Sequence, residues 1–96
     1  MQYVYMLKCS DNSFYTGRTG NIDERIKRHQ EGRGAGYTDL NGPVELVYFE
    51  ECDDLVLAIK REKAIKKLSV RNKIRLINWG KRNRLLPRVL LNYAKK

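Results

Sequence analysis

Hydrophobic and polar residues alternate from residue 2 to residue 9, in a stretch rich in strand-forming side chains. One face of this predicted strand would carry Tyr3, Tyr5, Leu7 and Cys9. The opposite face would carry Val4, Met6 and Lys8. The next four residues, Ser-Asp-Asn-Ser at 10–13, are typical of a turn. Residues 14–18 are therefore predicted to return beside the first strand as a hairpin.

A helix is predicted soon after the hairpin, over residues 22–30. Asn21 is a favourable N-cap, and Glu24, three residues later, completes a capping box. Ile22 and Ile26 are one helical turn apart, so they form a narrow apolar stripe that would face the core.

The glycines in this part of the chain indicate a tight turn and the end of the helix. Gly17 and Gly20 flank the exit from the hairpin, where a tight turn toward the helix is predicted. Gly32 is predicted to end the helix. The glycine-rich residues 32–36 lack a following Lys-Ser/Thr pair and do not follow a strand, which argues against a nucleotide-binding loop.

A third strand is predicted over residues 44–50, directly after Pro43. Branched and aromatic residues occupy both of its faces. This pattern predicts a central strand that is covered on both sides.

The next predicted helix spans residues 55–68 and begins after two acidic residues, Asp53 and Asp54, which suit its N-terminus. Its apolar positions are Leu55, Ala58, Ile59 and Ile65. Glu62 falls four residues after Ala58 and three before Ile65, so helical spacing places a carboxylate on the buried stripe.

Ser69 is predicted to cap one more helix, which would run to about Trp79 and end at Gly80. Val70, Ile74 and Ile77 would share its apolar face. Residues 1–80 are predicted to form the folded domain. Residues 81–96 form a basic and apolar tail in which Pro87 is suited to a helical first turn. We predict a short terminal helix there, which either packs on the domain or joins copies of it into a homo-oligomer.

The totals limit the classes of protein. Ninety-six residues suffice for one modest core, and a hydrophobic fraction of 42% is ordinary for a folded domain. The apolar runs are far shorter than the roughly 20 residues of a membrane span, and the N-terminus lacks a signal-peptide pattern. We therefore expect a soluble, cytoplasmic protein without a membrane partner.

Two cysteines, Cys9 and Cys52, are far apart and show none of the spacings of a zinc site. Both are interpreted as small apolar residues in strands. A long-range disulfide between them is the alternative.

The net charge of +9 and the pI of about 9.8 favour a polyanionic partner. Ten of the eleven acids lie between Asp11 and Asp54, so Glu62 is the one acid of the strongly basic second half. A solvated helical face, or association with a ribosome or a membrane surface, would also produce this pattern. Nucleic acid is the favoured partner, and the choice between DNA and RNA stays open.

Four polar residues near the N-terminus are candidates for chemistry. Arg25 and His29 are four apart on one helical face and could both address phosphate oxygens, or could be two solvated side chains. Tyr5 and Tyr15 would meet across the hairpin, where tyrosines usually contribute packing. A phenol beside cations can have its pKa lowered toward the range of a base, which is the chemical alternative.

Glu62 would supply what these four residues lack. Phosphodiester hydrolysis needs an activated water, neutralisation of the developing charge and help for the leaving oxygen. One carboxylate that holds one Mg²⁺, with waters and substrate phosphate as the other ligands, could serve the last two needs. An ion pair with Lys66 at helical spacing, or a buried one with Arg25, explains the same residue without chemistry.

The order of these motifs resembles the GIY-YIG nuclease domain. The motifs are Tyr-Val-Tyr at 3–5, Tyr-Thr-Gly at 15–17, Arg25 with His29, and Glu62. The stretches Tyr-Val-Tyr-Met-Leu-Lys-Cys-Ser-Asp, Pro-Val-Glu-Leu-Val-Tyr and Arg-Glu-Lys-Ala-Ile-Lys-Lys-Leu are similar to those of the small stand-alone subgroup named UPF0213. The resemblance covers roughly residues 2–78.

The resemblance implies an α+β fold, a small α/β sandwich with a three-stranded antiparallel sheet flanked by helices. It also implies a one-metal phosphodiester hydrolase dependent on Mg²⁺ or Mn²⁺. Tyr5 would be the general base or water-orienting group, Tyr15 would assist it, and Arg25 would bind the scissile phosphate. His29 would contact phosphate or relay a proton, and Glu62 would ligate the metal.

The nucleic-acid-binding surface is assigned to basic residues around these motifs: Arg18, Arg28, Lys66, Lys67 and Arg71. Two positions depart from the family pattern, because Tyr3 replaces its first glycine and Thr16 its second isoleucine. The asparagine that many members carry after the glutamate is either Asn72 or Asn78.

These features predict a structure- or strand-selective DNA endonuclease acting in DNA repair, recombination or processing. A binding module for DNA or RNA that uses the same basic surface is the main alternative, and it would be indifferent to Glu62. A protein that assembles through its terminal apolar helix is a third possibility, which truncation after Gly80 would test.

Overall fold

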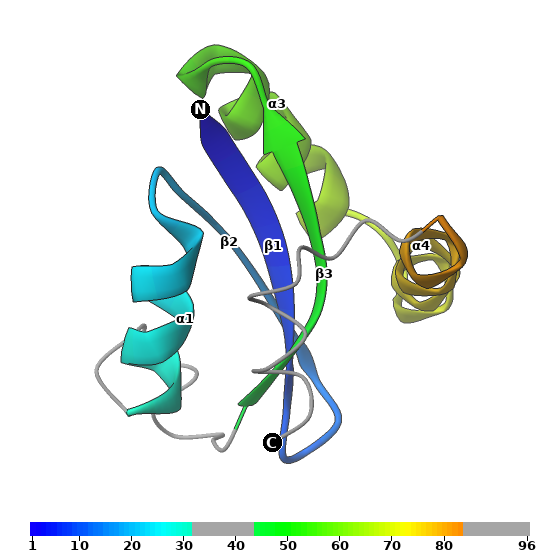
Figure 1. Cartoon of the computed structure of the whole chain (residues 1–96). Coiled ribbons are helices and arrows are strands. Elements are labelled where there is room, and N and C mark those ends of the chain that lie inside the picture. Colours follow the sequence, from blue (N-terminus) through cyan, green and yellow to red (C-terminus); the bar gives the residue numbers. More distant parts are fainter. Residues whose placement is uncertain (32–43, 84–96) are drawn as a thin grey trace.

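The computed structural model of the chain describes residues 1–31 and 44–83. Its elements in chain order are β1 (Gln2–Cys9), β2 (Phe14–Thr19), α1 (Ile22–Gln30), β3 (Val44–Cys52), α3 (Leu55–Lys66) and α4 (Val70–Arg82). The three strands form one antiparallel sheet in the order β2-β1-β3. This confirms the predicted α+β class, with helices on both faces of the sheet (Figure 1). The predicted helix end at Gly32 and the tail helix beginning at Pro87 lie outside the described residues.

The hairpin forms as its turn residues predict. In β1 and β2, Tyr5 lies opposite Gly17 and Leu7 opposite Tyr15. The turn between them places Asn12 at a φ of 69°, a left-handed conformation that asparagine tolerates well. The Asp11 carboxylate accepts the Ser13 backbone N–H at 3.0 Å, which closes the turn locally.

β1, not β3, is the central strand, so the prediction that residues 44–50 form the centre of the sheet is wrong. β3 is an edge strand whose residues are nevertheless buried on both faces. Its pairing shifts between Met6, opposite Tyr48, and Leu7, opposite Leu46, which leaves Val47 as an extra residue. Two-sided burial reflects coverage by helices and does not distinguish an edge strand from a central one.

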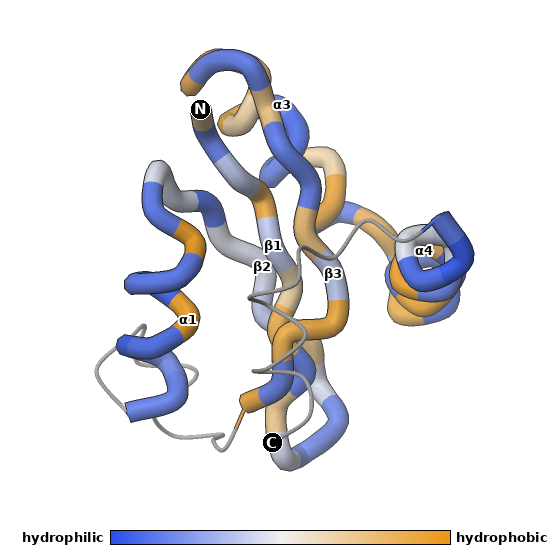
Figure 2. The backbone as a smooth tube through the Cα atoms, viewed as in Figure 1, coloured by the Kyte–Doolittle hydropathy of each residue, from blue (hydrophilic) through white to orange (hydrophobic). Residues whose placement is uncertain are grey.

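The sheet separates two apolar cores. The first lies between the sheet and α1 and contains Tyr5, Leu7, Cys9, Ile22, Ile26, Val44, Leu46 and Phe49. The second lies beneath α3 and α4 and contains Val4, Met6, Val47, Tyr48, Cys52, Ala58, Ile65 and Ile77. Figure 2 shows the apolar residues of α1 on the side toward the sheet. The alternation predicted for the first strand therefore divides its residues between the two cores.

Each of the three helices in the described residues starts at a predicted capping residue. The side chains of Asn21, Asp54 and Ser69 each accept a hydrogen bond from the backbone N–H three residues later, at 2.8 to 3.1 Å. Asn21 Nδ2 also lies 3.4 Å from Glu24 Oε2. These caps fix where each helix leaves the sheet.

α4 continues through Gly80 to Arg82, so the predicted end at Gly80 is wrong. Gly80 is buried within the helix, and the end is capped by Asn83, whose Nδ2 donates to the Trp79 carbonyl at 2.8 Å. The inward face is also rotated from the predicted one. Ile77 is buried, whereas Val70 and Ile74 are 62% and 43% exposed.

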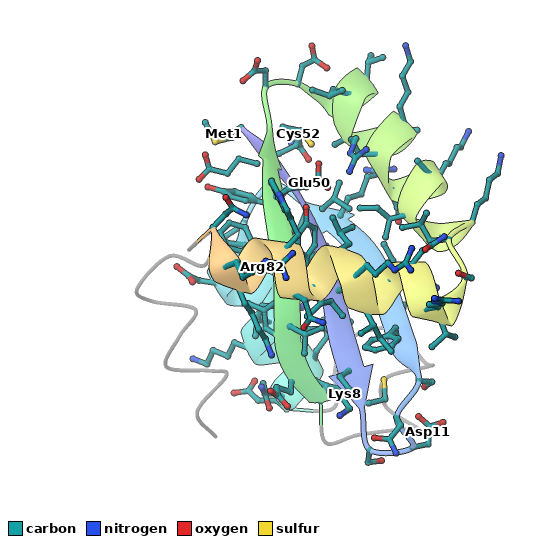
Figure 3. The ribbon with its side chains drawn as sticks, turned by 90° about the vertical axis from the view of Figure 1, so that its right-hand side faces the viewer. Met1, Lys8, Asp11, Glu50, Cys52 and Arg82 are labelled. Carbon is teal, nitrogen blue, oxygen red and sulfur yellow. The ribbon has the colours of Figure 1, made fainter. Side chains whose placement is uncertain are left out.

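α3 lies over the β2 side of the sheet and α4 crosses the strands (Figure 3). An ion pair between Arg61 and Glu50 joins α3 to β3, with Nε–Oε2 and Nη2–Oε1 distances of 2.8 and 2.9 Å. The Tyr48 hydroxyl donates to the same carboxylate at 3.1 Å. Leu55, one of the apolar positions expected to face inward, is instead 48% exposed at the start of α3.

Both cysteines are buried and unpaired, so the disulfide alternative is wrong. Cys9 pairs with Val44 at one end of β1, and Cys52 pairs with Gln2 at the other end. A strand of eight residues separates the two ends, which is too far for a disulfide. Each thiol instead packs in one of the two cores.

Candidate active site

Tyr5 lies at the centre of the candidate site, in the middle of β1 and on the face toward α1. Its ring is fully buried, and its hydroxyl is 3.0 Å from His29 Nε2. His29 is itself only 3% exposed, in the last turn of α1. The two side chains therefore form a buried phenol–imidazole pair, and His29 is not the solvated residue of the alternative interpretation.

Tyr15 completes an aromatic cluster with this pair. Its ring centroid is 6.4 Å from that of Tyr5 and 5.3 Å from that of His29, while Tyr5 and His29 are 5.9 Å apart. Such tilted contacts are favourable for aromatic rings. The hairpin thus brings the two tyrosines together as predicted, and the position of α1 adds the histidine.

The absence of a side chain at Gly17 leaves room for the Tyr5 phenol. A Cβ atom built on Gly17 would lie 2.6 Å from Tyr5 Oη, 2.8 Å from Tyr5 Cζ and 3.0 Å from Tyr15 Cε2. Gly17 lies within β2 and not at a turn, so the prediction that it flanks the exit from the hairpin is wrong. The signal was available, because a glycine inside a strand often marks the close approach of another group.

Arg25 approaches the phenol from the middle of α1. Its Nη1 donates to the Arg18 carbonyl at 3.4 Å, which holds the guanidinium near the end of β2. A hydrogen bond and the positive charge of Arg25 both act to lower the pKa of Tyr5. Arg25 is therefore in place to bind an anion that reaches the hydroxyl.

The pKa of Tyr5 is nevertheless raised, to about 12. Burial is the largest cause, the neighbouring Tyr15 is the second, and the Glu62 carboxylate adds to both. Arg25 acts in the predicted direction, but the expected net lowering of this pKa is wrong, because the loss of solvent outweighs the effect of Arg25. The phenol is therefore neutral at physiological pH and able to donate its proton.

Glu62 points from α3 toward the end of β2 and is mostly buried, with 16% of its side chain exposed. Its Oε1 lies 3.1 Å from Arg18 Nε, and its Oε2 lies 3.1 Å from Lys66 Nζ. The predicted pair with Lys66 is present, whereas the partner across the domain is Arg18 and not Arg25. Glu62 is close enough to Tyr5 for its charge to affect the pKa of the phenol.

The five predicted catalytic residues therefore form one connected group. Tyr5 contacts His29, Tyr15 and Arg25, while Arg18 links Arg25 to Glu62 through its carbonyl and its side chain. Among the predicted binding residues, Lys66 joins the group through Glu62. The other three, Arg28 of α1, Lys67 directly after α3 and Arg71 of α4, are exposed. The two candidate supporting asparagines, Asn72 and Asn78, are likewise exposed on α4.

The motifs that build this group match a family model described as the GIY-YIG catalytic domain, over residues 1–75. This chain belongs to the GIY-YIG family. The family is an endonuclease superfamily, and its first motif here includes Tyr5, with Tyr15 and Gly17 in the second.

Several relatives with high sequence similarity to this chain carry the name UPF0213. A UPF0213 protein of Clostridium perfringens is 53% identical over 78 residues, covering 81% of this chain and 84% of the relative. One of Syntrophus aciditrophicus is 49% identical over 76 residues, covering 78% and 87%. The solution NMR structure of a UPF0213 protein from Bacillus halodurans is 42% identical and superposes with a TM-score of 0.55, covering 82% of this chain and 85% of that one.

The donor atoms near the GIY-YIG motifs fit a hard divalent cation held by one carboxylate. Within residues 1–31 and 44–83, no group of three or more His, Cys, Asp or Glu side chains could hold a metal. Mg²⁺ commonly binds through one or two carboxylates, with waters and phosphate oxygens as its other ligands. Glu62 is a mostly buried carboxylate beside the phenol and Arg18, so it suits that role.

No helix in the described residues is long and apolar enough to cross a membrane.

Tyr5 should make the stability of the domain fall at alkaline pH. The folded state keeps the phenol proton up to about pH 12, whereas the unfolded chain releases it near 10.0. The contribution is therefore present below pH 10 and is lost between pH 10 and 12, by at most roughly 3 kcal/mol. Urea unfolding of wild type and Tyr5→Phe should show the stability advantage of wild type shrinking over this range. Parallel pH curves for the two proteins would contradict the assignment.

Proposed function

We propose that this protein is a metal-dependent endonuclease that hydrolyses DNA phosphodiester bonds and selects for the structure or strandedness of its substrate. The 3.0 Å contact between Tyr5 Oη and His29 Nε2, beside Arg25, is the observation that carries this proposal. A buried phenol that passes its proton to an imidazole can accept a proton from an attacking water in exchange. The surrounding cations favour an anionic substrate.

The proposed proton transfer follows from the neutral state of the phenol. An attacking water gives a proton to Tyr5 Oη while the phenol proton moves to His29 Nε2. This route avoids a free phenolate, which the raised pKa of Tyr5 makes costly. Tyr15 keeps the imidazole ring in place through its contact at 5.3 Å.

Arg25 would bind the scissile phosphate, because a guanidinium can offer two parallel N–H donors to phosphate oxygens. Arg18 would assist once the substrate competes with Glu62 for its side chain. Glu62 would hold Mg²⁺ or Mn²⁺, which supplies charge neutralisation and help for the leaving oxygen. The basic residues Arg28, Lys66, Lys67 and Arg71 would bind the flanking backbone.

A non-catalytic DNA- or RNA-binding module is the second candidate. One observation favours it, because both Glu62 oxygens are already paired with cations. Such a pair would neutralise the acid within a purely basic binding surface. The module would bind with steep salt dependence and would not need Glu62.

Cleavage assays separate the two candidates. Purified protein should cut at least one of single-stranded, duplex or branched DNA with Mg²⁺ or Mn²⁺, and EDTA should stop the cleavage while anisotropy still reports binding. Denaturing gels of end-labelled substrates give the products. Binding to all three substrates without cleavage under either metal would contradict the endonuclease proposal and support the binding module.

A further inference from the structure

A hollow of about 180 Å³ lies beside the candidate active site and includes three residues that the predicted site lacks. It is lined by Phe14, Tyr15 and Thr16 of β2, Lys66 of α3 and Lys73 of α4. Sites for drug-sized ligands commonly measure about 300–1,000 Å³, so this hollow suits a smaller group. Its walls come from three elements that the fold fixes relative to one another.

The charge of the hollow is positive. Lys66 and Lys73 both contribute to its lining, and Lys66 pairs with the carboxylate of Glu62, which also pairs with Arg18. Lys73 forms no ion pair with any residue that the structure describes. Two ammonium groups with one acid leave a net charge that an anion would neutralise.

Thr16 adds an unused hydrogen-bonding group. The residue is only 4% exposed, and its Oγ1 has no hydrogen-bond partner in the described part of the chain. A buried hydroxyl without a partner costs free energy, so such a group calls for an explanation. A ligand oxygen in the hollow would accept its proton and remove that cost.

We propose that this hollow is a second phosphate-binding site, which holds a backbone phosphate next to the one at Tyr5. The proposal rests on the proposed function only in naming nucleic acid as the source of the phosphate. The two sites share a residue, because Tyr15 belongs to both the ring cluster and the lining of the hollow, and Lys66 of the hollow reaches Glu62 at 3.1 Å. A strand that fills both sites must pass over β2, which is an edge of the sheet.

The lysine of α4 gives the main test. Lys73→Ala should weaken binding of a short single-stranded oligonucleotide in EDTA by about three- to tenfold, and should lower the slope of log affinity against log salt by about 0.7 to 0.9. Lys81→Ala is the matched control, because Lys81 is an exposed lysine on the same helix and does not line the hollow. Equal effects of the two variants would overturn the proposal.

Thr16→Val tests the hydroxyl without changing charge. The variant should bind the oligonucleotide about two- to fivefold more weakly, while its salt slope and melting temperature stay the same or the melting temperature rises. A lower melting temperature with unchanged affinity would show that the hydroxyl serves the fold and would overturn its assignment to a ligand. Inorganic phosphate should shift the amide NMR signals of Phe14, Thr16 and Lys73, and a chloride titration should not.

These measurements also separate this proposal from the endonuclease. They measure binding in EDTA, where no cleavage is needed. If the protein never cuts DNA but Lys73→Ala loses affinity, the second phosphate site is supported and the endonuclease proposal is contradicted. A protein that cuts DNA, with Lys73→Ala binding as tightly as wild type, would keep the nuclease and overturn the hollow.

Discussion

Gly17→Ala is expected to abolish cleavage and to destabilise the domain by about 1–3 kcal/mol. The new Cβ would lie 2.6 Å from Tyr5 Oη, and the phenol is fully buried between β1 and α1. Neither the ring nor the strand can move without disturbing the contact with His29 or the pairing with β1. Cleavage gels and urea unfolding of the purified variant measure the two effects.

Gly20→Ala is the control for this substitution. A Cβ at Gly20 would meet the end of the Gln2 side chain, with Nε2 at 3.2 Å, and a flexible side chain can turn away. The free energy of unfolding and the cleavage activity of this variant should be close to those of wild type. Normal cleavage by Gly17→Ala would show that the Tyr5–His29 geometry is not needed for the chemistry.

Glu62→Gln is expected to lower cleavage by more than about a hundredfold while DNA binding stays equal or becomes tighter. The substitution removes the carboxylate that is proposed to hold the metal, and it releases Arg18 and Lys66 from their ion pairs. Both cations then become available to phosphate. The fold should lose about 1 kcal/mol or less, because these partners are 40% and 54% exposed and can be solvated.

Glu51→Gln is the matched control, since Glu51 is an exposed glutamate in β3 outside the candidate site. It removes the same charge and should cut DNA as wild type does. The readouts are single-turnover cleavage rates and anisotropy with the same oligonucleotide. Retention of wild-type cleavage by Glu62→Gln would exclude Glu62 as the metal ligand and leave the binding module as the better explanation.

Local signals account for what the sequence predicts correctly. Strand alternation, the turn after Cys9, and the caps at Asn21, Asp54 and Ser69 depend on residues a few positions apart, and the structure confirms all of them. The resemblance to the GIY-YIG family then supplied the α+β arrangement and named the five residues that the structure brings together.

The errors concern quantities that depend on the whole fold. Strand order is one, because β3 is covered on both faces although it is an edge. The pKa of Tyr5 is another, since its direction follows from the depth of burial and not from the charges nearby in sequence. The ion pair of Arg18 with Glu62 involves distant segments that no spacing rule connects, and so does the hollow that Thr16 and Lys73 both line.

The strand order also bears on the sequence of events during folding. The β1–β2 hairpin closes over short separations, as Tyr3 pairs with Thr19, whereas Gln2 must find Cys52 before the sheet is complete. Closure of the longer loop costs more entropy, so local elements are expected to form first. Tyr5 and Tyr15 lie in this hairpin, Arg25 and His29 lie in the helix directly after it, and Glu62 lies in α3. An incompletely synthesised domain would therefore hold its tyrosines and histidine together while it still lacks the carboxylate that the proposed endonuclease needs for its metal.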